Sequence, residues 1–217
     1  MLKKIRVWDL PTRVFHWLLA ICVSGLFATG LTGGNWIIWH ERFGFVVLAL
    51  LLFRIIWGVI GSETSRFTDF LRGPRALILY LKTGVNPTQG HSPLGGLSVL
   101  ALLSLLLLQA CTGLFVDDDI ANKGPLADKV SGAWVALATK VHRLNKYALG
   151  AMILLHLCAI IFYTYKKRQQ LVGPMISGER VVENPATEPR IHSGFAPWLV
   201  LAGCAAFVYW LVAIYGR

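Results

Sequence analysis

The residues of this 217-residue chain with the strongest chemical potential are four histidines at or inside long apolar segments. They are His16, His40, His142 and His156. An ionisable side chain at membrane depth costs free energy and usually has a functional role. The remaining two histidines, His91 and His192, lie in turn-rich or polar connecting segments, where solvation or turn formation explains them.

The elements that must position these histidines are membrane-spanning helices. The chain is 55% hydrophobic and 15% charged, with a mean hydropathy of +0.59, which is typical of an integral membrane protein. Its five apolar stretches each approach the ~20 residues that a helix needs to cross a bilayer. They cover residues 14–32, 36–60, 94–115, 141–165 and 196–215. We therefore predict an all-α integral membrane bundle of five helices, the first retained rather than cleaved as a signal peptide.

Basic residues predict the orientation of this bundle. The segments before the first stretch, between the second and third, and between the fourth and fifth hold 13 of the 21 Lys and Arg residues. The opposite side carries acidic residues at Asp117, Asp118, Asp119 and Asp128. The positive-inside rule then places the N-terminus in the cytoplasm and the C-terminus outside. The net charge of +10 reflects this topology and attraction to lipid, and no motif indicates nucleic-acid binding.

The four cysteines give no sign of a metal or disulfide framework. Cys22, Cys111, Cys158 and Cys204 lie singly inside predicted helices, without a C-x-x-C or C-x-x-C-H motif. This spacing argues against disulfides, zinc ribbons and covalently attached c-type haem. They are best explained as small packing residues.

The histidines fall into two pairs by depth. His142 and His156 are fourteen residues apart, so one helix carries them about 21 Å apart along its axis and on nearly the same face. In the predicted topology, His40 lies at the external level of His142, and His16 lies at the cytoplasmic level of His156. One metal ion cannot use both levels, whereas two stacked sites can.

Two histidines at one level suit an axially ligated haem. Zinc prefers four ligands, and neither level offers an obvious Cys, Asp or Glu to complete a set. A haem needs only two axial ligands, because its porphyrin supplies four nitrogens. Glycines would leave flat space for the macrocycle, although close helix packing explains them as well. They are Gly25, Gly30, Gly44, Gly113 and Gly150.

Several motifs together resemble the bacterial cytochrome b561 and nickel-hydrogenase cytochrome b subunit family. They are VWDLPTRVFHW, WHERFGF, RIIWGVIGS, GHSPLGGLSVLALL and QACTGLF, with the two histidines of the fourth helix. The resemblance covers about residues 6 to 168. It implies a bacterial inner-membrane protein with two haem b groups, whose axial ligands are His16 with His156 and His40 with His142.

The resemblance also implies a domain organisation. Residues 1–168 would form the four-helix di-haem domain, 169–194 a cytoplasmic linker, and 195–217 an additional transmembrane helix. The fifth helix extends beyond the core of the smallest family members, and it could pack beside the bundle, bind a partner or form an oligomer contact.

Arginines inside the bundle are candidate partners of haem propionates. Arg54 lies well inside the second helix, where its charge needs compensation, and Arg pairs bidentately with carboxylates. Snorkelling to the headgroups is the alternative. Arg13 could act in the same way or serve as a topology anchor. Arg143 and Lys146, beside His142, could hold propionates or attract an anionic partner, and Glu41 could accept a proton.

Two connecting segments have the pattern of surface helices. In PLADKVSGAWVALATK, apolar residues recur at helical spacing, which predicts a short helix lying on the membrane over the outer haem. FLRGPRALILYLK on the other side predicts a second interfacial segment. No internal repeat or low-complexity run is evident.

Three functions remain open at this stage. The first is electron transfer across the membrane between quinone or quinol and a periplasmic redox partner, such as a c-type cytochrome or a hydrogenase, by bis-histidine haems without an open iron site. The second is a superoxide:quinone oxidoreductase, in which basic residues steer the anion; the aspartates at 117–119 weaken it. The third is a haem-free transporter or scaffold with a histidine proton relay, which depth pairing argues against. We favour the first.

Overall fold

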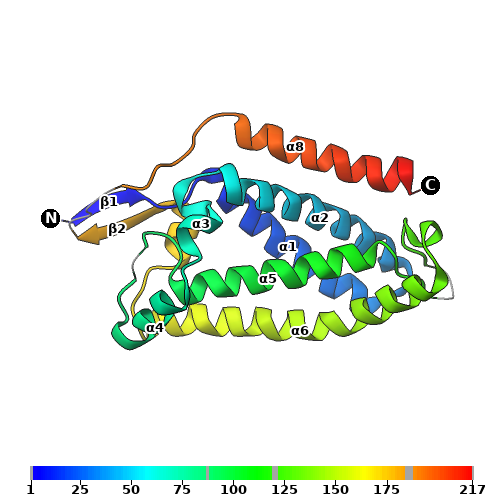
Figure 1. Ribbon diagram of the computed structural model, residues 1–217, viewed down its shortest axis with the longest axis horizontal. Helices are drawn as coiled ribbons and strands as arrows, with labels where there is room; N and C mark the ends of the chain where they lie inside the picture. The colour runs from blue at the N-terminus through cyan, green and yellow to red at the C-terminus, as the bar shows by residue number, and fades with distance from the viewer. Residues whose placement is uncertain (1, 87, 119–121, 184–187, 217) are drawn as a thin grey trace. The chain divides into compact units, whose positions relative to one another are not determined.

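The computed structural model describes residues 2–86, 88–118, 122–183 and 188–216, so Asp119 of the acidic run lies outside the described residues. Among these residues, five helices are long and apolar enough to cross a membrane. They are α1 (Leu10–Thr32), α2 (Ile37–Ile60), α5 (Pro93–Gly113), α6 (Gly132–Tyr165) and α8 (Ala196–Tyr209), the last continued by a π-helical turn Trp210–Tyr215 (Figure 1). The predicted all-α, multi-pass membrane bundle is confirmed.

The chain forms two compact units, which are described separately. The first unit comprises Met1–Phe15, Arg54–Ala101 and Met152–Trp198. The second unit comprises His16–Phe53, Leu102–Ala151 and Leu199–Arg217.

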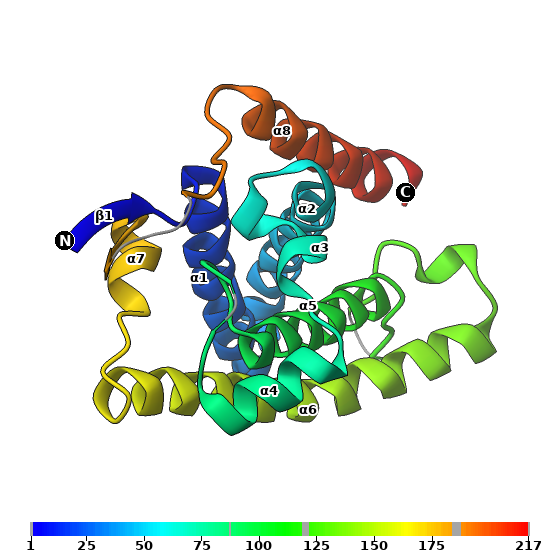
Figure 2. The same cartoon turned by 60° about the vertical axis from the view of Figure 1, so that its left-hand side comes forward.

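The first unit contains a two-stranded sheet that the sequence analysis did not anticipate. Strand β1 (Leu2–Arg6) pairs antiparallel with β2 (Glu179–Glu183), and the short helix α7 (Val172–Ser177) precedes β2 beside β1 (Figure 2). Ile5, Val7 and Trp8 are buried and pack against Met175 and Val182. The segment expected as a linker therefore carries ordered structure that holds the N-terminal strand in place.

Three short helical elements of the first unit lie at the predicted interfacial segment or just before it. They are a 3-10 turn (Glu63–Ser65), α3 (Phe67–Phe70) and α4 (Pro74–Thr83). α4 begins with Pro74, whose missing N–H costs nothing in a first turn, and it ends at Gly84, which adopts the left-handed conformation with φ 70°. On α4, the buried Tyr80 hydroxyl donates to Tyr163 Oη at 3.3 Å.

A buried polar group, here called the Asp9 cluster, joins three segments of the first unit: Asp9, Thr12, Trp57 and Ser65. Asp9 is 1% exposed and accepts hydrogen bonds from Thr12 N at 2.7 Å, Trp57 Nε1 at 2.9 Å and Ser65 Oγ at 3.3 Å. The hydroxyls of Thr12 and Ser65 are 2.7 Å apart. Because Asp9 caps the first turn, α1 begins at Leu10 rather than at the predicted residue 14.

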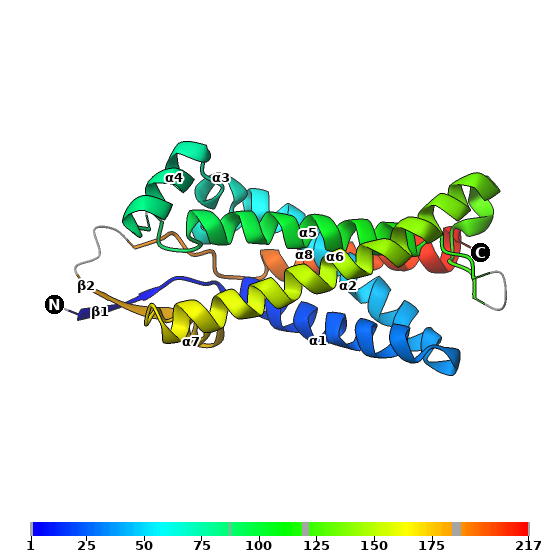
Figure 3. The ribbon, with the colours of Figure 1, turned by 90° about the horizontal axis from the view of Figure 1, so that it is seen from below.

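The apolar core of the second unit centres on α2 and the chain after α5. Leu48, Ala49, Leu114, Leu126 and Val208 are buried together. The end of α8 thus packs on the connection between α5 and α6, as Figure 3 also shows. That connection contains a bridge between Asp117 and Lys123 and a 3-10 turn (Ala127–Lys129).

The predicted separate surface helix before residue 141 is wrong. α6 runs without interruption from Gly132 to Tyr165, so residues 132–140 of the amphipathic stretch are its first part (Figure 3). Lys140, Arg143, Asn145 and Lys146 end the apolar run, yet they do not end the helix, because none of them is a strong helix breaker. At ~1.5 Å per residue, 34 residues span about 51 Å, which exceeds a bilayer core of about 30 Å.

Candidate functional site

The second unit brings together His40 of α2 and His142 of α6, which the sequence predicts as a pair. Their ring centres are 6.3 Å apart, and the two planes meet at 78°. Both histidines are partly buried, and each imidazole is within hydrogen-bond distance of a neighbouring helix of the unit.

Both rings present the same nitrogen to a backbone carbonyl. His40 Nδ1 lies 3.0 Å from Leu26 O of α1, and His142 Nδ1 lies 3.0 Å from Gln109 O of α5. Because a carbonyl oxygen only accepts, a neutral ring in this position carries its proton on Nδ1. The lone pair of each ring is then on Nε2, which is the arrangement of a histidine that binds a metal.

A cavity of about 430 Å³ adjoins the two histidines. Its volume falls within the range of small-molecule and cofactor sites. Its wall is mainly apolar and includes Val23, Leu26 and Phe27. Five charged side chains of the second unit line it as well. These are Glu41, Asp118, Lys123, Arg143 and Lys146.

The donor set and spacing of this site fit a bis-histidine haem. A metal–imidazole nitrogen bond measures about 2 Å and the ring centre lies about 1 Å beyond, so two rings on one metal have centres about 6 Å apart. The observed 6.3 Å agrees. Among the described residues, no group of three or more His, Cys, Asp or Glu could hold a metal ion without a macrocycle. The residues present therefore suit a haem better than zinc.

Three of the predicted glycines lie against side chains, which agrees with the alternative of close packing. A Cβ at Gly25 would lie 2.7 Å from the Phe43 ring, one at Gly30 would lie 2.8 Å from His40, and one at Gly113 would lie 3.1 Å from His142. These glycines receive side chains of the protein rather than flat space for a macrocycle. Gly30, Gly44 and Gly113 all line the cavity, but a Cβ at Gly44 meets no atom within 4 Å. A Cβ at Gly150 would meet only the Phe27 ring, at 3.9 Å.

The other predicted haem ligands belong to different units. His16 is in the second unit, where its ring contacts Trp17 edge-on at 5.1 Å, and His156 is in the first. The pairing of His16 with His156 stays a prediction.

Arg54 is deeply buried in the first unit. It is 2% exposed, so it does not reach out to the headgroups, and its guanidinium carbon lies 4.8 Å from the Phe67 ring centre and 5.9 Å from that of Phe70. It interacts electrostatically with Asp9. Within the described part of the chain, its buried Nη1 has no hydrogen-bond partner. An anionic group beside this nitrogen would complete its bonding.

Arg13 and Arg143 have distinct surroundings. Arg13 donates through Nη1 to the carbonyl of Ile176, near the end of α7 in the first unit, which gives it a structural contact. Arg143 lines the histidine cavity of the second unit and also a second, open cavity of about 750 Å³. Arg143 and His142 thus line the same cavity, and a contact of Arg143 with a propionate there stays a prediction.

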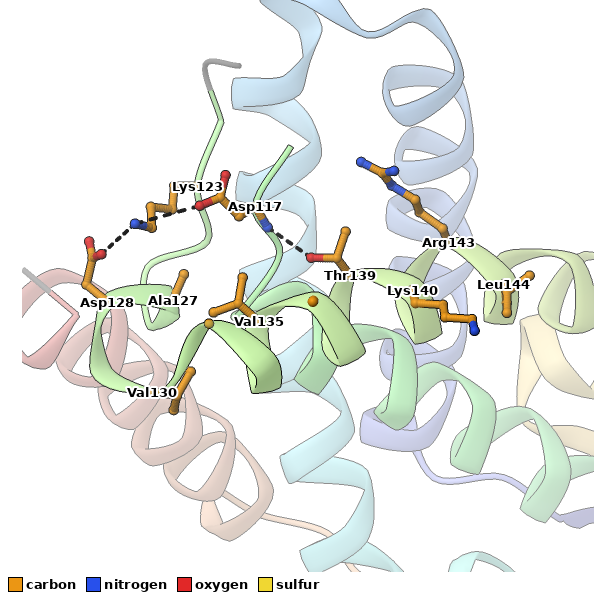
Figure 4. Close-up of a pocket in the computed structure, with 12 residues that line it drawn as sticks. Asp117, Lys123, Ala127, Asp128, Val130, Val135, Thr139, Lys140, Arg143 and Leu144 are labelled. Atoms are coloured by element: carbon orange, nitrogen blue, oxygen red, sulfur yellow. Dashed lines mark hydrogen bonds and ion pairs between the residues drawn. The ribbon is translucent and has the colours of Figure 1, made fainter. Parts of the chain in front are cut away.

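The acidic residues near the histidine cavity are largely engaged. Lys123 Nζ lies between Asp128 Oδ1, at 2.5 Å, and Asp117 Oδ2, at 3.7 Å, and Arg143 stands apart from this group on α6 (Figure 4). The hydrogen bond to Asp128 raises the pKa of Lys123 above its ordinary value. Asp118 accepts hydrogen bonds from Asn122 at 2.9 and 2.6 Å.

The sequence analysis missed the polar side chains that hold His142. Gln109 Nε2 donates to His142 O at 3.1 Å, and Asn145 Nδ2 donates to Gln109 Oε1 at 2.8 Å and to Leu105 O at 2.9 Å. Thr112 Oγ1 lies 3.3 Å from His142 Nδ1. The available signal was an amide side chain in each of two apolar helices, since such groups are costly in lipid unless they are paired.

Comparison with known proteins identifies the family. The fold and the histidine pair define a multi-pass helical membrane protein equipped for haem ligation. A family model described as prokaryotic cytochrome b561 matches residues 7–178, and the chain belongs to that family. It is a membrane b-type cytochrome of electron transport, as the sequence resemblance predicts.

Named relatives match over most of their length. The chain is 22% identical over 218 residues to a "Probable Ni/Fe-hydrogenase B-type cytochrome subunit" of Rhizobium leguminosarum bv. viciae, covering 84% of this chain and 91% of that protein. It is 21% identical over 220 residues to the protein of the same description from Rhodobacter capsulatus, covering 85% and 84%. No solved structure matches the chain significantly.

Proposed function

We propose that the protein carries two haem b groups and passes electrons across the bacterial inner membrane, between the quinone pool and a periplasmic redox protein. The observation that carries this proposal is the His40–His142 pair, in which both Nδ1 atoms lie on carbonyls and the rings are separated as two axial ligands require. A bis-histidine haem supplies one-electron transfer without an open iron position.

The second unit would hold the first haem through Nε2 of His40 and His142. Its mainly apolar wall suits the face of a macrocycle, while Arg143 and Lys146 in the lining offer positive charge to propionates. The carbonyls of Leu26 and Gln109 keep the two rings in one tautomer.

His16 and His156 are the proposed ligands of the second haem, from their depth in the sequence and from the family resemblance. Arg54 supports this assignment: it is 2% exposed, and its Nη1 has no hydrogen-bond partner among the described residues, so it suits a buried carboxylate such as a propionate. Arg13 is a further candidate from the sequence, although its Nη1 contacts the Ile176 carbonyl.

The topology and partners follow from charge and from the relatives. The positive-inside rule favours a cytoplasmic N-terminus and a periplasmic C-terminus. We assign residues 1–168 to the di-haem domain, 169–194 to a cytoplasmic connection and 195–217 to the additional helix. The relatives' description as hydrogenase subunits favours a partner within a membrane complex, and a c-type cytochrome is the alternative partner; an oligomer would fit the fifth helix.

Haem content tests the proposal directly. The purified protein should contain about two low-spin haems per chain, and His142→Ala or His156→Ala should each remove one of them and stop transmembrane reduction. Leu155→Ala, on the exposed surface of α6, is the matched control and should keep both haems. Two low-spin haems in either histidine variant would overturn the ligand assignment.

A superoxide:quinone oxidoreductase is the second candidate function. Arg143 and Lys146 line the histidine cavity and would attract a small anion, which favours it. Asp118 and Glu41 line the same cavity and oppose that attraction. Reduced protein should be mixed with a co-encoded periplasmic cytochrome, and oxidised protein with superoxide; reaction with superoxide alone would favour the second function.

A further inference from the structure

His40 and His142 rest on two equivalent sites in the helices beside them. In α1, the accepting carbonyl of Leu26 precedes Gly30 by four residues, and in α5, the carbonyl of Gln109 precedes Gly113 by four residues. In each case the imidazole bonds to the carbonyl and lies over the glycine one turn later. We call these the α1 seat (Leu26 and Gly30) and the α5 seat (Gln109 and Gly113).

We propose that the two seats position the axial imidazoles and set the electron-donor strength of their Nε2 atoms toward the iron. The proposal rests on the haem site at His40 and His142 and deepens it. It assigns a positioning role to Gly30 and Gly113, for which the sequence suggested space for a macrocycle or close helix packing.

Glycine is required in each seat because the ring edge approaches the helix backbone closely. A Cβ at Gly30 would lie 2.8 Å from both Cε1 and Nδ1 of His40, closer than real Cβ contacts. A Cβ at Gly113 would lie 3.1 Å from Cε1 and 3.4 Å from Nδ1 of His142. The His40 ring would have to move away from such an atom, and the His142 ring would have to shift by a few tenths of an ångström. Either shift disturbs the hydrogen bond of 3.0 Å to the carbonyl.

The hydrogen bond at Nδ1 connects the seat to the metal. A ligating histidine that donates its other ring N–H to a carbonyl is fixed in orientation and becomes a stronger donor. Hydrogen bonding around the ligands is one of the factors by which a protein sets a haem's reduction potential. Loss of the bond would weaken donation from Nε2 and raise the potential of this haem.

The seats also share a short sequence pattern, although it is too short to be an internal repeat. Thr-Gly-Leu occurs at residues 29–31 in α1 and at 112–114 at the end of α5. In each helix the threonine hydroxyl donates at 2.6 Å to the carbonyl four residues earlier. The tripeptide alone does not predict a binding site. It is informative here because one of the two imidazoles lies on each copy of it.

The α5 seat is more strongly braced. Asn145 holds the Gln109 side chain, which donates to the backbone of His142 itself, while Thr112 Oγ1 also approaches Nδ1. The α1 seat has the tighter glycine contact instead. Alanine at Gly30 should therefore disturb its ligand more than alanine at Gly113.

The test uses Gly30→Ala and Gly113→Ala in the purified haem-loaded protein, with Gly203→Ala as the matched control. Gly203 is a helical glycine of α8 in the same unit, and a Cβ there meets no atom within 4 Å. The readouts are haem content, the low-spin electron paramagnetic resonance g-values and the midpoint potential of each haem. Both seat variants should change the g-values and raise the potential of the same haem, the shift being larger for Gly30→Ala.

Unchanged g-values and potentials in both seat variants would overturn the proposal. If Gly30→Ala does not fold, Gly113→Ala still decides, because its Cβ needs only a small shift of the ring. His142→Ala separates the two hypotheses: full haem content there contradicts the haem site itself. Loss of one haem in His142→Ala, together with seat variants that match the wild type, contradicts the seats alone.

Discussion

The Asp9 cluster of the first unit and the histidine cavity of the second unit show two ways of burying polar groups in a membrane protein. Asp9 accepts three hydrogen bonds from Thr12, Trp57 and Ser65, so the cluster satisfies its central carboxylate from within the chain. Such a closed network needs no ligand, and its role is to fix the segments that it joins.

In the histidine cavity, the two rings are hydrogen-bonded to the protein through Nδ1. His40 and His142 each engage Nδ1 with a carbonyl, and a cavity of about 430 Å³ adjoins the rings. This difference separates a structural network from a binding site. In the Asp9 cluster the protein provides the hydrogen-bond partners. In the histidine cavity it orients two imidazoles toward a partner that must be bound. Substitutions in the two regions should therefore have opposite signatures.

Filling the cavity should have the largest effect on the cofactor. Gly44→Leu places a side chain in open space beside His40, where it would compete with a haem for volume. The substitution should not disturb the packing of the protein itself, because a Cβ at Gly44 meets no atom within 4 Å. We expect loss of about half of the bound haem, measured as the haem-to-protein ratio, with helix content unchanged by circular dichroism.

Gly203→Leu is the matched control, since a Cβ at Gly203 also meets nothing within 4 Å but this glycine is not among the lining residues of the cavity. It should retain the full haem content. Equal haem content in the two variants would show that the cavity beside His40 does not hold the cofactor.

Disrupting the Asp9 cluster should lower stability instead. Asp9→Ala leaves the donors of Thr12, Trp57 and Ser65 without their acceptor and removes the negative charge near Arg54. Buried donors and charges without partners cost about 3 kcal/mol in sum. We expect a fall of that order in the free energy of unfolding in detergent, while the folded fraction keeps its haem-to-protein ratio.

The control for this variant is Asp69→Ala, which removes a half-exposed ion pair with Arg66. Exposed pairs contribute about 0–1 kcal/mol, so its effect should be small. If Asp9→Ala were no less stable than Asp69→Ala, the cluster would not be the structural network described above.

Much of this architecture could be predicted because membrane physics acts on local sequence. Apolar length alone identifies the five helices, and the topology predicted from basic residues places His40 and His142 at one level. The structure confirms that these two rings meet. Helix ends were less predictable: charged residues interrupt the hydropathy of α6 without interrupting the helix, and Asp9 starts α1 four residues early.

Long-range and backbone partners left little trace in the sequence. The pairing of Leu2 with Glu183 joins strands at opposite ends of the chain, and neither five-residue strand has a clear alternating pattern. The acceptors for the histidines are carbonyls of Leu26 and Gln109, which every residue type possesses. For this reason the histidines could be identified from sequence, but their orientation could not.

The smallest expected effect comes from one hydroxyl at the edge of the Asp9 cluster. Thr12→Val keeps nearly the same shape and removes the hydrogen bond of 2.7 Å between Thr12 Oγ1 and Ser65 Oγ. Because Asp9 keeps its own three donors, including the Thr12 backbone N–H, we expect a loss of only about 1 kcal/mol in the free energy of unfolding. Thr32→Val, which removes an exposed hydroxyl bonded to Ala28 O, should change it less. A loss for Thr12→Val as large as that for Asp9→Ala would mean that the hydroxyl, and not the carboxylate, is the centre of the network.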